Sequence, residues 1–157
     1  METKTSTFLV SHADEGAATL TDVHDRQVHA LAEQLDPPLE QEEIVEATIE
    51  SSGDIDVAWT VKTVIERKTI PIERSPEPPT VQEQDIAAAQ SVGEITRQER
   101  AGTGELHVIT VPEETTEQAV EDVAEDPETL ARAARMGVDR VEIRAEDGVL
   151  SVRYMPS

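Results

Sequence analysis

Carboxylate side chains outnumber cationic ones by 34 to 13 in this chain of 157 residues, and that excess constrains its folding more than any motif. A formal charge of -21 makes a compact state repel itself in dilute buffer. At about 1 M salt the Debye length falls to roughly 3 Å, and most of that repulsion is screened. Only three of the cations are lysines. We therefore interpret the chain as a folded, cytoplasmic protein of a halophilic archaeon.

Disorder is the competing interpretation, because a high net charge with few aromatic residues is typical of unfolded chains. The aromatic residues are Phe8, Trp59 and Tyr154. Alternating apolar runs and a capped helical segment favour a folded chain with some flexible stretches. The chain has no cysteine, which excludes disulfides and thiolate metal sites. No apolar run approaches the roughly 20 residues of a membrane span, so we expect no membrane association.

Short alternating runs with turns between them predict β-structure over the first 70 residues. The longest run places five residues on one face, which we expect to be buried: Val57, Trp59, Val61, Thr63 and Ile65. Its other face carries polar side chains, with Val64 as the apolar exception. Five short strands in sequence predict a small closed barrel of OB or SH3-like type over residues 1–74.

A proline-rich stretch, residues 75–80, predicts a stiff linker, because proline cannot donate ladder hydrogen bonds and favours an extended chain. The second domain then covers residues 81–157. It begins with a helix capped by Thr80 and Glu83, and a hairpin turns at Gly102 and Gly104. Two helices and a final hairpin follow. The predicted fold class is therefore α+β, with the barrel followed by a four-stranded sheet that carries two or three helices on one face.

Catalytic and cofactor motifs are missing from the sequence. Gly102-Thr103-Gly104 lacks the spacing of a dinucleotide or phosphate loop, and no Gly-x-Ser-x-Gly pattern occurs. His24 and His29 lie near Asp22 and Asp25, but no pair of histidines has zinc-type spacing. We therefore expect a non-enzyme without a cofactor or a resident metal. A small metal-assisted enzyme that uses His24 and His29 remains an alternative.

The last 30 residues depart from the acidic character of the chain. Residues 128–157 contain five arginines and five acids, so residues 1–127 carry the whole imbalance. On the final hairpin, alternation places Arg140, Arg144 and Arg153 on one face around Glu142. Arginine binds carboxylate and phosphate groups through two parallel hydrogen bonds, so this face is the first candidate binding surface. The alternative is that these arginines pair with Glu142 and with acids of neighbouring helices.

Two further groups of cations are secondary candidates. Arg132 and Arg135 lie on the helix that precedes the final hairpin. The second group lies where the barrel ends and the linker begins, and consists of Lys62, Arg67, Lys68 and Arg74. Barrels that bind nucleic acid usually add aromatic platforms for base stacking. Trp59 lies on the apolar face of its strand, so we expect it in the core.

Three stretches of the chain resemble an uncharacterised family of haloarchaeal proteins known only as a domain of unknown function. They are Thr7-Phe8-Leu9-Val10 with His12-Ala13-Asp14-Glu15, residues 99–105, and residues 131–135 continuing into Arg140-Val141-Glu142. This resemblance covers nearly the whole chain and implies no activity. Residues 7–70 are also similar in strand order to RNA-binding OB domains. Glu40-Gln41-Glu42-Glu43 stands where those domains usually have a Gly-Asp turn.

The sequence thus predicts a non-enzymatic binding or adaptor protein, with RNA or a ribonucleoprotein as its partner. The open alternative is a protein-protein adaptor without nucleic acid, in which the same arginines contact acidic protein surfaces. Only the position of the cations separates these two interpretations, because a net charge of -21 is expected of any protein adapted to high salt.

Overall fold

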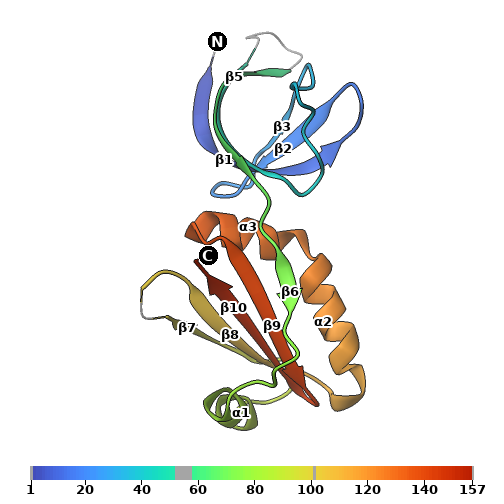
Figure 1. Ribbon diagram of the computed structural model, residues 1–157, viewed down its shortest axis with the longest axis vertical. Coiled ribbons are helices and arrows are strands. Elements are labelled where there is room, and N and C mark those ends of the chain that lie inside the picture. The colour runs from blue at the N-terminus through green and yellow to red at the C-terminus, as the bar shows by residue number, and fades with distance from the viewer. Residues whose placement is uncertain (1, 52–57, 101, 157) are drawn as a thin grey trace. The chain divides into compact units, whose positions relative to one another are not determined.

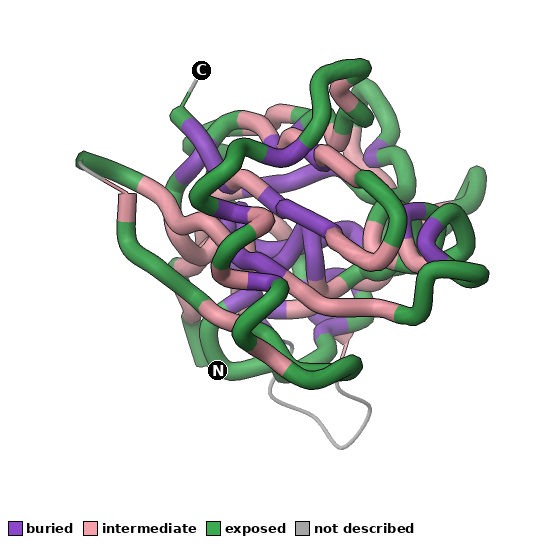
Figure 2. The backbone as a smooth tube through the Cα atoms, turned by 90° about the horizontal axis from the view of Figure 1, so that it is seen from below, coloured by how far each residue is buried: buried purple, intermediate pink, exposed green. Residues whose placement is uncertain are grey.

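The computed structural model describes residues 2–51, 58–100 and 102–156, and it confirms the α+β class (Figure 1). The chain divides into two compact units. The first holds Met1–Ile70 with Leu130–Arg135, and the second holds Pro71–Thr129 with Met136–Ser157. Each unit contains one five-stranded sheet. Most of the buried residues lie on strands. Figure 2 shows how buried and exposed residues alternate along the chain.

The strands of the first sheet follow the order β3-β2-β1-β4-β5, and all neighbours are antiparallel. They are β1 (Thr3–Ala13), β2 (Ala18–Asp22), β3 (Val28–Ala30), β4 (Ile44–Ser51) and β5 (Trp59–Lys68). Alternate residues along β1, β2 and β4 form the centre of the core: Phe8, Val10, Leu20, Val45, Ala47 and Ile49. This core follows from the period-two pattern of apolar residues in the sequence.

The two edges of this sheet meet at a single parallel bridge between Leu31 and Trp59. Next to the bridge, Ala32 N donates to the carbonyl oxygen of Trp59 at 2.9 Å. The irregular segment that follows, residues 32–39, contributes Leu39 to the core. The described residues contain no continuous ladder between β3 and β5, so the predicted closed barrel is not confirmed.

The strand β5 departs from the alternation that the sequence predicts. Two β-bulges in its pairing with β4 leave Lys62 and Ile65 without a paired residue, so that Val64 pairs with the buried Ala47. Of the face predicted to be buried, Trp59 is buried, Val61 is half-buried, and Thr63 and Ile65 are exposed, while Val57 lies outside the described residues. The predicted burial of Thr63 and Ile65 is therefore wrong, because each bulge shifts the side-chain alternation by one residue.

The second sheet follows the order β6-β9-β10-β8-β7. Its strands are β6 (Ile72–Arg74), β7 (Ile95–Glu99), β8 (Glu105–Thr110), β9 (Arg140–Glu146) and β10 (Val149–Met155). The prediction of four strands is wrong by one, because the three-residue β6 pairs in parallel with β9. A strand this short leaves no periodic signal in the sequence. As predicted, Gly102 and Gly104 turn the β7–β8 hairpin with positive φ angles.

The helices are α1 (Val81–Ala88), α2 (Thr116–Glu125) and α3 (Pro127–Met136), with a short 3-10 turn, η1 (Glu113–Thr115), before α2. In the second unit, α1 and α2 lie on opposite faces of the sheet. Glu83 of α1 bonds Arg153, whereas Glu117 of α2 bonds Arg74, which pairs in register with Ile143. Arg153 pairs in register with Glu142, and Glu142 and Ile143 point to opposite faces of β9. The expected single helical layer is therefore wrong for these two helices.

The proline-rich stretch connects β6 to α1 within the second unit. Ser75 N donates to the carbonyl oxygen of Ile143 at 2.8 Å and so extends the pairing of β6 with β9. Thr80 and Glu83 form the predicted capping box at the start of α1. Glu77 of this segment contacts Arg144, so residues 75–80 lie along the face of the sheet that carries the candidate arginines.

Candidate functional site

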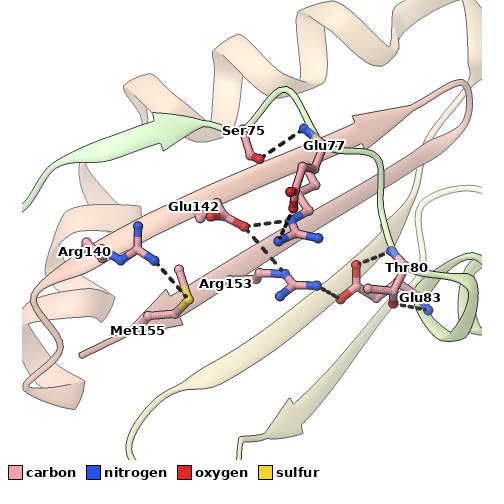
Figure 3. Close-up of polar contacts among 9 residues, drawn as sticks. Ser75, Glu77, Thr80, Glu83, Arg140, Glu142, Arg153 and Met155 are labelled. Atoms are coloured by element: carbon pink, nitrogen blue, oxygen red, sulfur yellow. Dashed lines mark hydrogen bonds and ion pairs between the residues drawn. The ribbon is translucent and has the colours of Figure 1, made fainter. Parts of the chain in front are cut away.

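The three arginines predicted to share a face of the final hairpin lie on that face. Arg153 pairs in register with Glu142, and Met155 pairs with Arg140 on the neighbouring strand. Figure 3 shows these side chains on one side of the β9–β10 hairpin, together with Glu77 and Glu83 from the segment that leads into α1. The arginine face, defined as Arg140, Arg144 and Arg153, is therefore confirmed as a geometric unit.

Arg144 lies between two carboxylates of its own chain. Its Nε donates to Glu142 Oε1 at 2.7 Å, and one terminal nitrogen lies 3.0 Å from Glu77 Oε2. The hydrogen bond to Glu142 raises the pKa of Arg144, so the guanidinium stays charged at all accessible pH values. The side chain is only 16% exposed. Arg144 is thus an internal ion-pair residue covered by the proline-rich segment.

Arg153 bonds a buried carboxylate. One terminal nitrogen donates to Glu83 Oε2 at 2.6 Å, and Glu83 is only 3% exposed. The other oxygen of Glu83 accepts from Thr80 N at 3.0 Å, so one carboxylate both caps α1 and holds that helix on the sheet. Arg153 Nε lies 3.9 Å from Glu142 Oε1. This pairing between strands and helix is the alternative that the sequence analysis described.

Arg140 is half-buried and contacts the sulfur of Met155 at 3.9 Å. Arg132 and Arg135 lie on α3 and are also half-buried. They belong to the first unit, whereas the arginine face belongs to the second. The structure therefore assembles three of the five candidate arginines of residues 128–157 on one face, and the other two belong to a different unit.

The residues of the secondary patch are divided between the two units. Arg67 donates to Glu43 at 2.6 Å and to the carbonyl oxygens of Pro37 and Pro38. Burial alone would raise the pKa of Glu43, but the bonds from Arg67 and from the backbone amide of Glu40 lower it. Lys62 lies 4.0 Å from Glu50, and Lys68 follows Arg67 at the end of β5. Arg74 belongs to the second unit, where it pairs with Glu117.

A buried polar cluster in the first unit was missed by the sequence analysis. Lys4 Nζ lies 2.9 Å from Asp22 Oδ2, 2.6 Å from Asp25 Oδ2 and 3.0 Å from His29 Nε2. Asp22 is 2% exposed and His29 is 4% exposed. The sequence analysis singled out the aspartates and histidines but not Lys4, because β1 and β3 are distant in sequence and only the sheet brings them together.

The metal-assisted alternative placed His24 and His29 around a cation. In the structure, His24 is exposed, and His29 faces the ammonium group of Lys4. Among the described residues, no three histidine or carboxylate side chains converge in a way that would hold a metal ion. The cation that Asp22 and Asp25 contact is the ammonium group of Lys4.

An open groove of about 400 Å³ lies beside α1 in the second unit. Its walls come from α1 and the residues after it, from the end of β8, and from the β9–β10 turn. Apolar lining residues predominate, and they are Ala87, Ala88, Val92, Val111, Pro112 and Val149. Val92 is 62% exposed. The one sequence signal for this groove is Val92, an apolar residue in an otherwise polar turn. The groove itself was not predicted from the sequence.

A search for relatives adds a family but no function. None of the described helices is long and apolar enough to cross a membrane. Neither a curated protein nor a solved structure matches the chain. The sequence profile of a family of unknown function (DUF5812) matches residues 4–145, and the chain therefore belongs to that family.

Proposed function

We propose that this chain is a non-enzymatic module that binds a protein partner in the salt-rich cytoplasm of a halophile. The observation that carries the proposal is the pairing of Arg144 and Arg153 with carboxylates of the same chain. A phosphate group that approached either arginine would compete with the carboxylates of Glu77, Glu142 or Glu83 for the same guanidinium group. The proposal therefore favours the protein-protein adaptor over the RNA-associated protein.

The pairing of strands in the first unit supports an OB-like, partly open barrel. In that fold the first strand pairs with the second and the fourth, the fourth pairs with the fifth, and the third runs parallel to the fifth. The first three of these pairings are present as ladders. The bridge between Leu31 and Trp59 is parallel and joins the end of β3 to the start of β5.

The face on which OB barrels bind oligonucleotides has little to offer RNA in this chain. That face lies over the second and third strands and the loop after the first strand. Outward residues on β2 and β3 are Thr19, Thr21, Val28 and Ala30, as their register with the buried Leu20 and His29 shows. The turn after β1 carries Asp14 and Glu15. Bases find no aromatic platform among these residues, and phosphates find like charge.

The groove beside α1 is the surface we assign to the partner. Its lining is mostly apolar and includes the exposed acids Glu113 and Asp147. Such a groove suits a partner segment with an apolar side chain flanked by lysine or arginine. Apolar burial strengthens rather than weakens in concentrated salt, whereas contacts between exposed charges weaken. An apolar groove is therefore a suitable binding surface for a protein that works in brine.

The substitution Val92→Glu tests this assignment. A carboxylate at this position makes the groove polar, so we expect at least a tenfold loss of partner protein captured from lysate in 2 M KCl. Val81→Glu is the matched control, because Val81 is 75% exposed and does not line the groove. Both positions are exposed, so circular dichroism should show that both variants stay folded.

Three outcomes would contradict the proposal. Equal capture by Val92→Glu and Val81→Glu would remove the groove as the binding surface. RNA retained by the wild-type chain in 2 M KCl, and lost on Arg144→Glu, would support the RNA-associated protein instead. A stoichiometric transition metal in protein purified without an affinity tag would favour the metal-assisted enzyme.

A further inference from the structure

The outer edge of β7 carries backbone groups that no other described strand pairs with. β7 is the last strand of the second sheet, and its only ladder is the one with β8 (Figure 1). The register of that ladder is regular from Ile95 to Glu99, without a bulge. Four of these five residues are exposed. Among the described residues, therefore, neither a bulge nor a further strand protects this edge.

The hydrogen bonds at the two ends of the ladder fix which residues point outward. Thr110 N donates to Glu94 O, and Arg100 N donates to Gly104 O. Hydrogen-bonded pairs recur at every second residue of an antiparallel ladder, so the even-numbered residues of β7 bond β8. The N–H and C=O groups of Ile95, Arg97 and Glu99 therefore point to the free edge.

Arg97 is the unusual side chain of this edge. Most arginines of the chain bond other residues, as Arg67, Arg74, Arg144 and Arg153 do. Within the described residues, nothing bonds the exposed guanidinium of Arg97. Glu99 is exposed two residues further along the same strand, and alternation places both side chains on the same face. The edge therefore presents one cation and one anion side by side.

We propose that β7 pairs with β7 of a second copy of this chain, antiparallel and around a two-fold axis at Gln98. In that register Arg97 lies opposite Glu99 of the second copy, and the same contact recurs across the axis. Each Arg97–Glu99 pair also exchanges two backbone hydrogen bonds, because both residues point outward. An isologous contact of this kind joins the two sheets into one of ten strands.

Charge selects this register over its neighbours. A two-fold axis at Arg97 opposes two arginines, and an axis at Glu99 opposes two glutamates. An axis at Thr96 places Arg97 opposite Ile95 and forms no ion pair. Like charges directly opposite one another destabilise a strand pair, and unlike charges stabilise it. The two charges that make β7 a poor edge for an arbitrary strand therefore suit it to a second copy of itself.

A single cysteine at the axis tests the proposal directly, because the chain has no native cysteine. In the proposed pairing Gln98 faces Gln98 of the second copy as a non-hydrogen-bonded pair, whose Cα atoms lie about 4.5 Å apart. That spacing suits a disulfide. We expect mild oxidation of Gln98→Cys in 2 M KCl to give a disulfide-linked dimer at least tenfold faster than oxidation of Gln82→Cys, an exposed control position on α1.

Charge exchange supplies the second arm. Arg97→Glu should weaken the dimer about tenfold in sedimentation equilibrium, because it opposes two pairs of glutamates. The double variant Arg97→Glu with Glu99→Arg should restore it. Lys62→Glu changes the net charge by the same amount elsewhere and should leave the dimer unchanged. Equal oxidation rates at positions 98 and 82, a wild-type chain that stays monomeric at millimolar concentration in 2 M KCl, or no recovery in the double variant would each overturn the proposal.

Discussion

Lys4 and His29 show how burial and a neighbouring charge together set the charge state of a residue. His29 packs edge-on against Trp59, with ring centroids 4.7 Å apart, and against Phe8. Burial, and then the ammonium group of Lys4, lower the pKa of His29. Burial alone would lower the pKa of Lys4 as well, but its bonds to Asp25 and Asp22 raise it. The cluster therefore holds a neutral imidazole beside a charged amine.

This cluster predicts a loss of stability on mild acidification. Because the pKa of His29 is lower in the folded state, the unfolded chain binds more protons as the pH falls below about 6.5. The free energy of unfolding should therefore fall as the pH drops from 7.5 to 5, and His29→Gln should abolish that slope. Thermal unfolding at several pH values, at constant 2 M KCl, measures both.

The exposed His24 provides the control for this titration, since His24→Gln should leave the slope intact. A second loss is expected at lower pH, because the pKa values of Asp22 and Asp25 are depressed and their stabilisation disappears as the carboxylates take up protons. A wild-type chain whose unfolding temperature is the same at pH 7.5 and pH 5 would contradict the role given to His29.

At the scale of secondary-structure elements, the proline-rich segment and α1 act together as a cover for the arginine face. Ser75 continues the β6 pairing, and Glu77 reaches Arg144. Glu83 reaches Arg153 (Figure 3). The two glutamates differ in environment, because Glu83 is buried and Glu77 is 66% exposed. Burial rather than charge should decide how much each pair stabilises the fold.

The substitutions Glu83→Ala and Glu77→Ala test that difference. Glu83→Ala removes half of the capping box and leaves Arg153 without its closest carboxylate, so we expect a loss of about 2–3 kcal/mol. Glu77→Ala breaks an exposed pair and should cost about 0–1 kcal/mol. Denaturant unfolding of both variants in 2 M KCl gives the comparison. Equal losses would show that the Arg153 contact contributes no more than an ordinary surface ion pair.

For the whole molecule, the surplus of acids makes the compact state dependent on salt. At 10 mM salt the Debye length is about 30 Å, and the carboxylates of each unit repel one another across its surface. The chain carries its charge of -21 on two small units. The core of each unit is small, so its burial supplies little free energy to oppose that repulsion.

We therefore expect the unfolding temperature to rise steeply between 10 mM and 2 M KCl, with loss of ordered structure on dialysis to the lower concentration. Circular dichroism during thermal unfolding measures this dependence. Sucrose at matched osmolality is the control, since it favours compact states without screening charge. An unfolding temperature that is independent of salt would contradict the halophilic interpretation, and a chain unstructured in 2 M KCl would contradict the fold itself.

Local signals in the sequence were sufficient for the elements that depend on neighbouring residues. The capping box at Thr80, the glycine turn of the β7–β8 hairpin and the shared face of Arg140, Arg144 and Arg153 all follow from spacing over a few residues. The acidic composition and the α+β class were likewise readable from the sequence. Each of these features is set by helix or strand periodicity, or by backbone conformations that few residue types adopt.

Contacts between distant residues were decided only by the tertiary structure. The bulges that expose Ile65, the parallel pairing of β6 with β9 and the approach of Lys4 to His29 leave no periodic signal. The same is true of the partners of the candidate arginines: alternation placed Arg144 and Arg153 on one face, but Glu77 and Glu83 reach that face only because the chain folds back over it. Periodicity determines which way a side chain points, whereas the packing of remote segments determines what it meets.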